Sequence, residues 1–222
     1  MSSIRFGANR RDFLLLGGAL SVAGVSLPTL ARGESKNAPA AAPTLDLLLA
    51  EPALPDLWVG DAKAPVTVIE YASMTCSHCA DFNVRTFPAL KAKYIDTGKV
   101  RFTLREFPLD PLAAAAAMLA RCSGDKREAV VELLFRQQKN WAFVNNPLEG
   151  LRDVLKQTGM GPAAFEACLN DQALFEKVNA IRDAAAQKFS INATPTFFIN
   201  GDKKSGEIPP EALDEALAPY FK

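Results

Sequence analysis

The sequence predicts an α/β fold in which an all-helical segment is inserted into a unit built on a central mixed β-sheet. Two short segments rich in apolar, β-branched and aromatic residues, 66–71 and 100–107, indicate buried strands. The long stretch 112–189 shows helical periodicity and no convincing strand. Strand character returns at 196–199. The helical stretch therefore lies inside the α/β unit and not after it.

The elements before the helical stretch follow from local signals. Residues 45–50 are apolar and predict a short helix. After the first strand, a helix is expected from Cys76 to about Thr97, where Gly98 ends it. Pro88 should kink this helix or divide it in two, because proline lacks the backbone donor that a helix needs.

The elements after the first two strands follow in the same way. Within the helical stretch, apolar residues between 174 and 189 recur at spacings of three and four, which predicts a long amphipathic helix. The dipeptide Asn200-Gly201 predicts a hairpin turn after the strand at 196–199, with a short strand to about Ile208. Pro209-Pro210 should open a last amphipathic helix.

The N-terminus resembles a secretory signal and not part of the fold. Arginines at positions 5, 10 and 11 precede an apolar run at 13–27, and Thr29-Leu30-Ala31 offers a cleavage site. The alternative is an uncleaved membrane anchor, but the run is shorter than the roughly 20 residues that a spanning helix needs. The paired arginines also suggest a twin-arginine export signal, with the Sec route as the alternative. We therefore expect a signal peptide at 1–31 and a linker with a short helix at 32–56.

Composition narrows the function. The chain has 222 residues, 49% of them hydrophobic, so it can bury a core without extra cross-links. Lys and Arg number 25, as do Asp and Glu, so nothing indicates a polyanionic partner such as nucleic acid. There are four cysteines and a single histidine, His78, which lies between two of the cysteines.

The motif Cys76-Ser77-His78-Cys79 has the features of a redox-active pair. Cys76 lies at an expected helix start, where free N–H groups and the helix dipole favour an anion. His78 can add positive charge or a hydrogen bond, and Cys79 lies one turn on, within reach of a disulfide. A stabilised thiolate favours the dithiol over the disulfide, which makes the disulfide oxidising. We expect substrate to attack Cys76 and Cys79 to resolve the mixed disulfide.

Two metal alternatives remain open at this point. A Cys-x-x-Cys pair can be half of a zinc site, but such a site needs four ligands and the other two cysteines do not form a second close pair. Soft ligands at Met74, Cys76, His78 and Cys79 could instead bind copper. Neither metal nor another cofactor is part of the leading interpretation.

Two motifs together resemble the DsbA-like branch of the thioredoxin superfamily. One is the segment from Gly60 to Tyr71 that leads into Cys76-Ser77-His78-Cys79, and the other is Ile191 to Gly201. The resemblance implies a thioredoxin-like fold with its first part at 57–109, a helical insertion at 110–187 and its second part at 188–222. It also implies a protein disulfide oxidoreductase.

The resemblance assigns roles to three further residues. Pro195 resembles the family's cis-proline facing the active disulfide, which leaves the backbone of Thr194 free to pair with an extended substrate. Glu70 matches a buried acid beneath the active site that could move protons to and from Cys79. An ordinary trans proline at 195 and a solvent-facing Glu70 are the alternatives. Met74, His78, Thr194 and Pro195 are expected to line an uncharged, partly apolar substrate groove.

The remaining cysteines, Cys122 and Cys168, both fall in the helical insertion. In an oxidising compartment they are expected to form a structural disulfide, as in some DsbA-like relatives, which would close a loop of about 45 residues. Two separately buried thiols are the alternative.

The leading hypothesis is a monomeric periplasmic enzyme that introduces disulfides into reduced exported proteins. The resemblance further implies a membrane redox partner that reoxidises it. A disulfide isomerase or reductase of the same fold is the alternative, because the residue before the cis-proline is often Thr in isomerase-type relatives. Against it, residues 32–56 are too few for the dimerisation domain of those proteins. A copper-binding chaperone module is the non-enzyme alternative.

Overall fold

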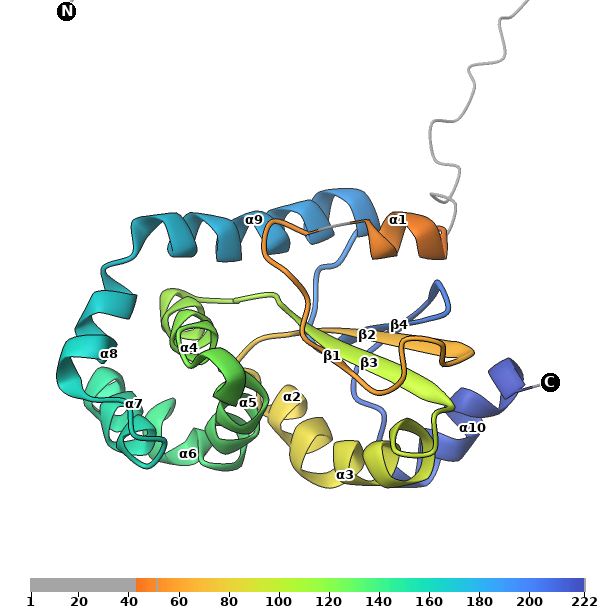
Figure 1. The fold of residues 1–222 in the computed structure, drawn as a ribbon, viewed down its shortest axis with the longest axis horizontal. Coiled ribbons are helices and arrows are strands. Elements are labelled where there is room, and N and C mark those ends of the chain that lie inside the picture. The colour runs from red at the N-terminus through yellow and green to blue at the C-terminus, as the bar shows by residue number, and fades with distance from the viewer. Residues whose placement is uncertain (1–42, 51, 222) are drawn as a thin grey trace, which may run out of the picture. The chain divides into compact units, whose positions relative to one another are not determined.

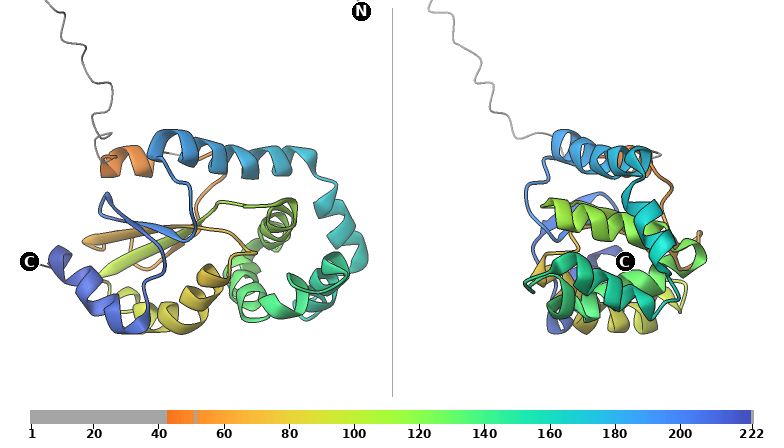
Figure 2. Two further views of the ribbon diagram at one scale, coloured as in Figure 1. Left: turned by 180° about the vertical axis from the view of Figure 1, so that it is seen from behind. Right: turned by 90° about the vertical axis from the view of Figure 1, so that its left-hand side faces the viewer.

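The computed structural model describes residues 43–50 and 52–221, so the expected export signal at 1–31 lies outside the described residues. A five-stranded mixed sheet has helices on both faces, and a further group of helices lies beyond one end of it (Figure 1). Figure 2 shows the same arrangement from behind and from the side. The predicted α/β fold with a helical insertion is confirmed. Within the described residues, no helix is both long enough and apolar enough to cross a membrane.

The sheet has the strand order β1-β3-β2-β4-β5. Strands β2 and β3 are parallel, and the other neighbouring pairs are antiparallel. Every residue of β2, the central strand, is buried, as expected for a strand with helices on both faces. The strands are β1 (Trp58–Val59), β2 (Val66–Ala72), β3 (Val100–Glu106), β4 (Thr196–Ile199) and β5 (Asp202–Ser205).

Two details of the sheet differ from the sequence prediction. The edge strand β1 was not expected, because two residues are too few to show an alternating pattern. Strand β5 ends at Ser205 and does not reach Ile208. The predicted hairpin turn between β4 and β5 is present, and both of its central residues, Asn200 and Gly201, have positive φ angles of 48° and 101°. Positive φ at both central positions is what a tight turn of type I′ requires.

The helix that joins β2 to β3 is a series of short segments. It comprises α2 (Ser77–Asp81), the π-helical turn η1 (Phe82–Thr86), α3 (Phe87–Leu90) and a second π-helical turn η2 (Lys91–Ile95). Pro88 lies at the start of α3. Its ring clashes with the carbonyl four residues earlier and it donates no hydrogen bond, which accounts for the wide turn η1 before it, and the helix continues beyond it.

Helices cover both faces of the sheet (Figure 1). One face carries α1 (Leu45–Leu49) and the C-terminal half of α9 (Gln172–Phe189), which share a buried cluster with side chains of β2 and β4. The helix between β2 and β3 packs on the other face with the C-terminal segment, which comprises η4 (Pro210–Ala212), α10 (Leu213–Leu217) and η5 (Ala218–Phe221). The predicted C-terminal helix is therefore present, with 3-10 turns at its ends.

The helical segment between β3 and β4 has a core of its own. Its largest buried side chain is Trp141, whose indole N–H donates to the carbonyl of Leu134 at 2.8 Å. Besides α9, the segment consists of α4 (Pro111–Arg121), η3 (Gly124–Lys126), α5 (Arg127–Arg136), α6 (Gln138–Trp141), α7 (Pro147–Lys156) and α8 (Pro162–Leu169).

A buried ion-pair cluster joins this segment to the sheet. Glu106, the last residue of β3, accepts two hydrogen bonds of 2.7 Å from Arg121 and one of 2.7 Å from Arg127. The carboxylate is 3% exposed, so the two guanidinium groups offset the cost of burying it. The cluster fixes the end of α4 and the start of α5 relative to the sheet.

A disulfide holds the helical segment together internally. Cys122, which ends α4, and Cys168, in α8, are bonded with an S–S distance of 2.09 Å. The pairing expected from the sequence is therefore present in the structure.

Replacing both Cys122 and Cys168 by Ala should destabilise the protein. A cross-link that spans 46 residues restricts the unfolded chain, and its loss should lower the free energy of unfolding by about 3–4 kcal/mol. Urea denaturation of the two proteins, both with Cys76 and Cys79 oxidised, measures the difference. Equal midpoints and slopes would show that this disulfide contributes nothing to stability.

Candidate active site

Two segments that are distant in the sequence meet at one end of β2. Cys76 precedes α2 by one residue, and Thr194 and Pro195 directly precede β4. Because β2 and β4 are antiparallel, with Tyr71 opposite Thr196, the end of one strand lies beside the start of the other. The Sγ atom of Cys76 lies 3.3 Å from the carbonyl oxygen of Thr194, and the Thr194–Pro195 peptide bond is cis.

The Cys76 sulfur is surrounded by hydrogen-bond donors. Its pKa is lowered from 9.0 to about 5, chiefly because the Cys79 thiol donates a hydrogen bond to it. The Thr194 side chain and the backbone N–H groups of Cys79 and His78 lower the pKa further, and partial burial opposes them. The backbone contribution arises because the first N–H groups of a helix have no partners within it. Cys76 is therefore a thiolate at neutral pH.

Cys79 differs from Cys76 in both its burial and the direction of its pKa shift. Its side chain is completely buried in the core that the helical segment shares with the start of α2. Burial is the main reason that its pKa is raised, and the hydrogen bond to Cys76 and the nearby Glu70 carboxylate add to the effect. The two sulfurs of one motif thus favour different protonation states. Only Cys76 is accessible to another molecule.

Glu70 is buried beneath the two sulfurs. It lies in the middle of β2, opposite Leu104 on one side and Phe197 on the other. Neither carboxylate oxygen has a hydrogen-bond partner among the described residues. Burial, and to a lesser extent the charge on Cys76, raise its pKa well above 4.5. Such a carboxyl group holds a proton more readily than an exposed one and can transfer it to a neighbour.

Thr194 offers the Cys76 sulfur two different partners. When Cys76 is a thiol, its S–H group faces the Thr194 carbonyl at 3.3 Å. The Thr194 hydroxyl is buried and has no hydrogen-bond partner in the described part of the chain. When Cys76 is a thiolate, this hydroxyl can donate to it, which explains why the Thr194 side chain lowers the pKa of Cys76.

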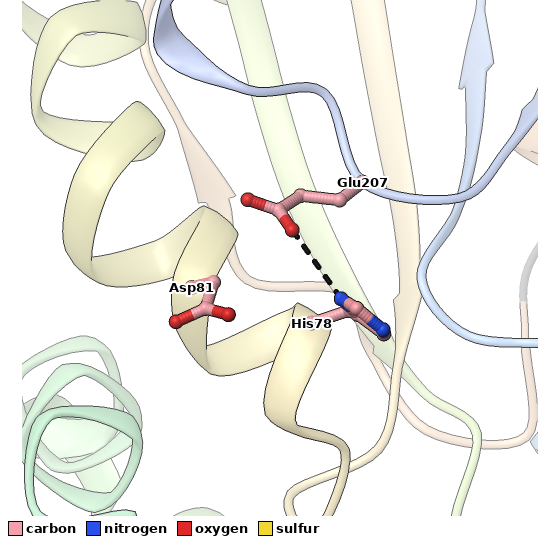
Figure 3. Close-up of side chains that lie close together, drawn as sticks. All are labelled: His78, Asp81 and Glu207. Carbon is pink, nitrogen blue, oxygen red and sulfur yellow. Dashed lines mark hydrogen bonds and ion pairs between the residues drawn. The ribbon is translucent and has the colours of Figure 1, made fainter.

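The imidazole of His78 does not face the Cys76 sulfur. It is 68% exposed, and its Nδ1 atom lies 3.4 Å from an oxygen of Glu207, in the segment that follows β5 (Figure 3). Asp81, one turn further along the helix, lies close to the same two residues. In this structure the backbone of His78, and not its ring, acts on the thiolate.

The donor set of the copper alternative is not assembled. His78, Asp81 and Glu207 are the one cluster of three or more His, Cys, Asp or Glu ligand atoms found among residues 43–50 and 52–221, and it contains no cysteine. Met74 is 3% exposed and packs in the core, away from any ligand at the surface.

The position of Met74 also does not fit the prediction that it lines a substrate groove. Its side chain packs in the core that the helical segment forms, and its carbonyl group is the part that contacts the site. The carbonyl groups of Met74 and Cys76 both accept hydrogen bonds from the amide of Gln138, at 2.8 and 3.0 Å. Gln138 is not among the site residues predicted from the sequence, since a single Gln in a helical stretch carries no motif. It fixes the loop that presents Cys76.

Comparisons with known proteins agree with this geometry. Residues 53–218 match the model of a protein family described as thioredoxin. The chain is 38% identical over 167 residues to a Rickettsia typhi protein named as a candidate protein-disulfide oxidoreductase. This match covers 73% of the chain and 62% of the Rickettsia protein, so the chain spans less than two thirds of that relative.

Solved structures of similar fold include DsbA-type proteins. The crystal structure of alpha-DsbA1 from Wolbachia pipientis has a TM-score of 0.71 and 32% identity, and the match covers 78% of this chain and 94% of that one. BdbD from Bacillus subtilis has a TM-score of 0.64 and 24% identity, with 74% and 92% covered, and it shows similarity of fold alone.

Cys76 in the reduced protein should titrate near pH 5, and Thr194→Val should raise this midpoint. The variant removes one donor to a charged sulfur, which is worth roughly one pH unit. The ultraviolet absorbance of the thiolate, followed against pH, measures both values.

Because the folded pKa is depressed, the thiolate stabilises the reduced protein above about pH 9. This stabilisation should be lost, relative to the oxidised protein, as pH falls toward 5.

Thr86→Val is the matched control for this experiment. Thr86 is also buried, and its hydroxyl has no hydrogen-bond partner among the residues that the structure describes, but it lies in η1 and does not act on Cys76. Its replacement should leave the titration of Cys76 unchanged. A midpoint near that of a free thiol, about 8.5, in the unmodified protein would contradict the donor arrangement described above.

Proposed function

The chain belongs to the thioredoxin family, in its DsbA-like branch, and on this basis we propose that it introduces disulfides into exported proteins by exchange at Cys76 and Cys79. The observation that carries the proposal is the contrast between the two sulfurs. Cys76 is an accessible anion, with a pKa of about 5, and Cys79 is buried with a raised pKa. Disulfides of this kind are strong oxidants, since reduction creates a stabilised thiolate.

The reaction follows from this contrast. A substrate thiolate attacks the sulfur of Cys76 in the Cys76–Cys79 disulfide, and the bond between the two breaks. Cys79 leaves and takes up a proton, and Cys76 is joined to the substrate. A second substrate thiolate then attacks the substrate sulfur of this mixed disulfide and expels Cys76 as a thiolate. The substrate loses two electrons and two protons. The enzyme gains both electrons and Cys79 keeps one proton, and the other proton passes to solvent because Cys76 remains a thiolate at neutral pH.

Glu70 is suited to supply the proton for Cys79. The Cys79 thiolate is less stable than the Cys76 thiolate, because it forms in the core, where burial raises the pKa of Cys79. Glu70 is close enough to act on that pKa, and its own raised pKa keeps a proton available. The proton returns to Glu70 when Cys79 attacks a mixed disulfide, so the carboxyl group serves both directions.

An extracytoplasmic location fits this proposal. The pattern of residues 1–31 is that of a secretory signal. The Cys122–Cys168 disulfide in the helical segment also favours an oxidising compartment, where such bonds persist. We place the protein in the periplasm as a monomer. Reduced exported proteins would be its substrates and a membrane protein its oxidant.

A second candidate function is disulfide isomerisation, and Thr194 is the residue that favours it. Its type is common before the cis-proline in isomerase-like relatives. An isomerase works from the reduced state, whereas the stabilised Cys76 thiolate makes the oxidised form a donor of disulfides. The reduction potential separates the two, and the oxidase remains the function that the site supports better.

The reduction potential of the Cys76–Cys79 pair should be well above that of thioredoxin, about −270 mV. Equilibration with glutathione buffers of known ratio, followed by alkylation of the free thiols, measures it. The oxidised protein should also form disulfides in a reduced, unfolded ribonuclease in stoichiometric amounts. The physical reason is that each turnover releases the Cys76 thiolate, which the surrounding donors stabilise.

Two variants test the separate roles of the sulfurs. Cys76→Ser should abolish the exchange. Cys79→Ser, with its Cys76 first activated by a small disulfide, should accumulate the mixed disulfide with a substrate that has a single thiol, because Cys79 is then absent and cannot release that substrate. A potential as low as that of thioredoxin would exclude the oxidase and favour a reductase or isomerase.

Glu70→Gln should slow the exchange by on the order of a hundredfold near neutral pH, because Cys79 then lacks its proton donor. Its reaction rate should also lose the pH dependence that Glu70 causes. The raised pKa of Glu70 means that its ionisation costs stability as pH rises from 4.5, so the variant should be relatively more stable at alkaline pH. Stopped-flow kinetics and urea denaturation at several pH values measure the two effects.

Glu215→Gln is the control, since it removes an exposed carboxylate of α10 far from both sulfurs. It should change neither the rate nor its pH dependence. An unchanged rate in Glu70→Gln would mean that water supplies the proton.

A further inference from the structure

A groove runs between α2, the helix that follows Cys76, and the helical segment that lies between β3 and β4. Its volume is about 550 Å³, and its walls come from α2 and η1 on one side and from α5 and α6 with the following loop on the other. It begins at Ser77, the residue after Cys76, and Ser77 is exposed. None of its lining residues belongs to the segment around Thr194 and Pro195, so it is distinct from the backbone expected to pair with substrate.

The groove presents apolar side chains to solvent. Val84 in η1 is 46% exposed and Phe143 after α6 is 61% exposed. Beyond Phe143, two more apolar residues are exposed, Val144 at 38% in the loop to α7 and Leu148 at 46% in the first turn of α7. A cluster of exposed apolar side chains next to a reactive thiolate is more typical of a binding surface than single scattered residues are.

Three cationic side chains also border the groove. Arg85 extends from η1, Arg136 from the end of α5 and Lys139 from α6, and all three are exposed. None of them forms an ion pair within the part of the chain that the structure describes. Asp81 is the one carboxylate among the lining residues. The groove therefore has an excess of positive charge that the fold itself does not use.

We propose that this groove binds a segment of the substrate that carries acidic and large apolar side chains close to its reactive cysteine. The inference rests on the proposed exchange at Cys76 and adds a substrate class to it. An extended chain advances about 3.3 Å per residue. Residues a few positions from a cysteine bonded to Cys76 would therefore lie along the groove, opposite Arg136 and Lys139.

Two peptides of equal length test this preference. Each has two cysteines and one Phe, and the residues around the first cysteine are Asp in one and Lys in the other. The measured quantity is the second-order rate at which the oxidised protein converts each dithiol to its disulfide. Each rate is divided by the rate of the same peptide with oxidised dithiothreitol, which corrects for the intrinsic reactivity of the thiols. The acidic peptide should react roughly threefold to tenfold faster, and added salt should reduce the ratio.

Charge reversal identifies the groove as the cause. The variant Arg136→Glu/Lys139→Glu should invert the preference. Lys177→Glu/Lys188→Glu, which makes the same change in net charge on exposed positions of α9, should keep it. In single-turnover reactions, Phe143→Ala should raise the peptide concentration that gives the half-maximal rate and leave the maximal rate unchanged, since its side chain contacts solvent and not the sulfurs.

Equal normalised rates for the two peptides, or the same preference in Arg136→Glu/Lys139→Glu, would overturn the proposed substrate class. Reaction with reduced dithiothreitol, which is small and uncharged, separates this failure from failure of the exchange itself. If every variant oxidises dithiothreitol at the rate of the unmodified protein, the function at Cys76 stands whatever the peptides show.

Discussion

The stabilisation of one negative charge on Cys76 is the interaction on which the rest of this site depends. Its donors come from three different places, namely the Cys79 thiol, the Thr194 side chain and the first backbone N–H groups of α2. They converge because β2 and β4 are paired so that the strand end before Cys76 lies beside the strand start after Thr194. Strand pairing, helix start and charge stabilisation are thus parts of one arrangement.

The helical segment also supports the site, because it buries Cys79 and holds the loop that carries Cys76. The core that it forms includes Cys79 and Met74, so the residues that bury the second sulfur belong largely to the segment. Gln138 reaches from α6 to two carbonyl groups of the loop before α2. The Glu106 cluster in turn fixes the segment to β3. A displacement of the helices would therefore expose Cys79 and loosen the loop that carries Cys76, because the same contacts serve both.

The parts of the molecule that sequence analysis could predict are those with a strong local signal. Long periodic helices, the central strands and the two active-site motifs of the DsbA-like branch have such signals. The edge strand β1 has none, because two residues pair with β3 only once the sheet exists. The burial of Met74 and the contacts of Gln138 also depend on tertiary packing. The same is true of Glu207, which lies 129 residues from its partner His78 and belongs to no motif.

His78 lies close to Cys76 in the sequence, but the contact of its ring differs from the one that the sequence suggests. Proximity in the sequence places its ring beside Cys76, but the ring is exposed and has Glu207 as a competing partner at 3.4 Å. An exposed pair of this kind is worth at most about 1 kcal/mol. The pair therefore adds little to the stability of the fold. The stabilisation of Cys76 in this structure comes from the Cys79 thiol, the Thr194 side chain and backbone N–H groups, and the ring of His78 is not among the contributors.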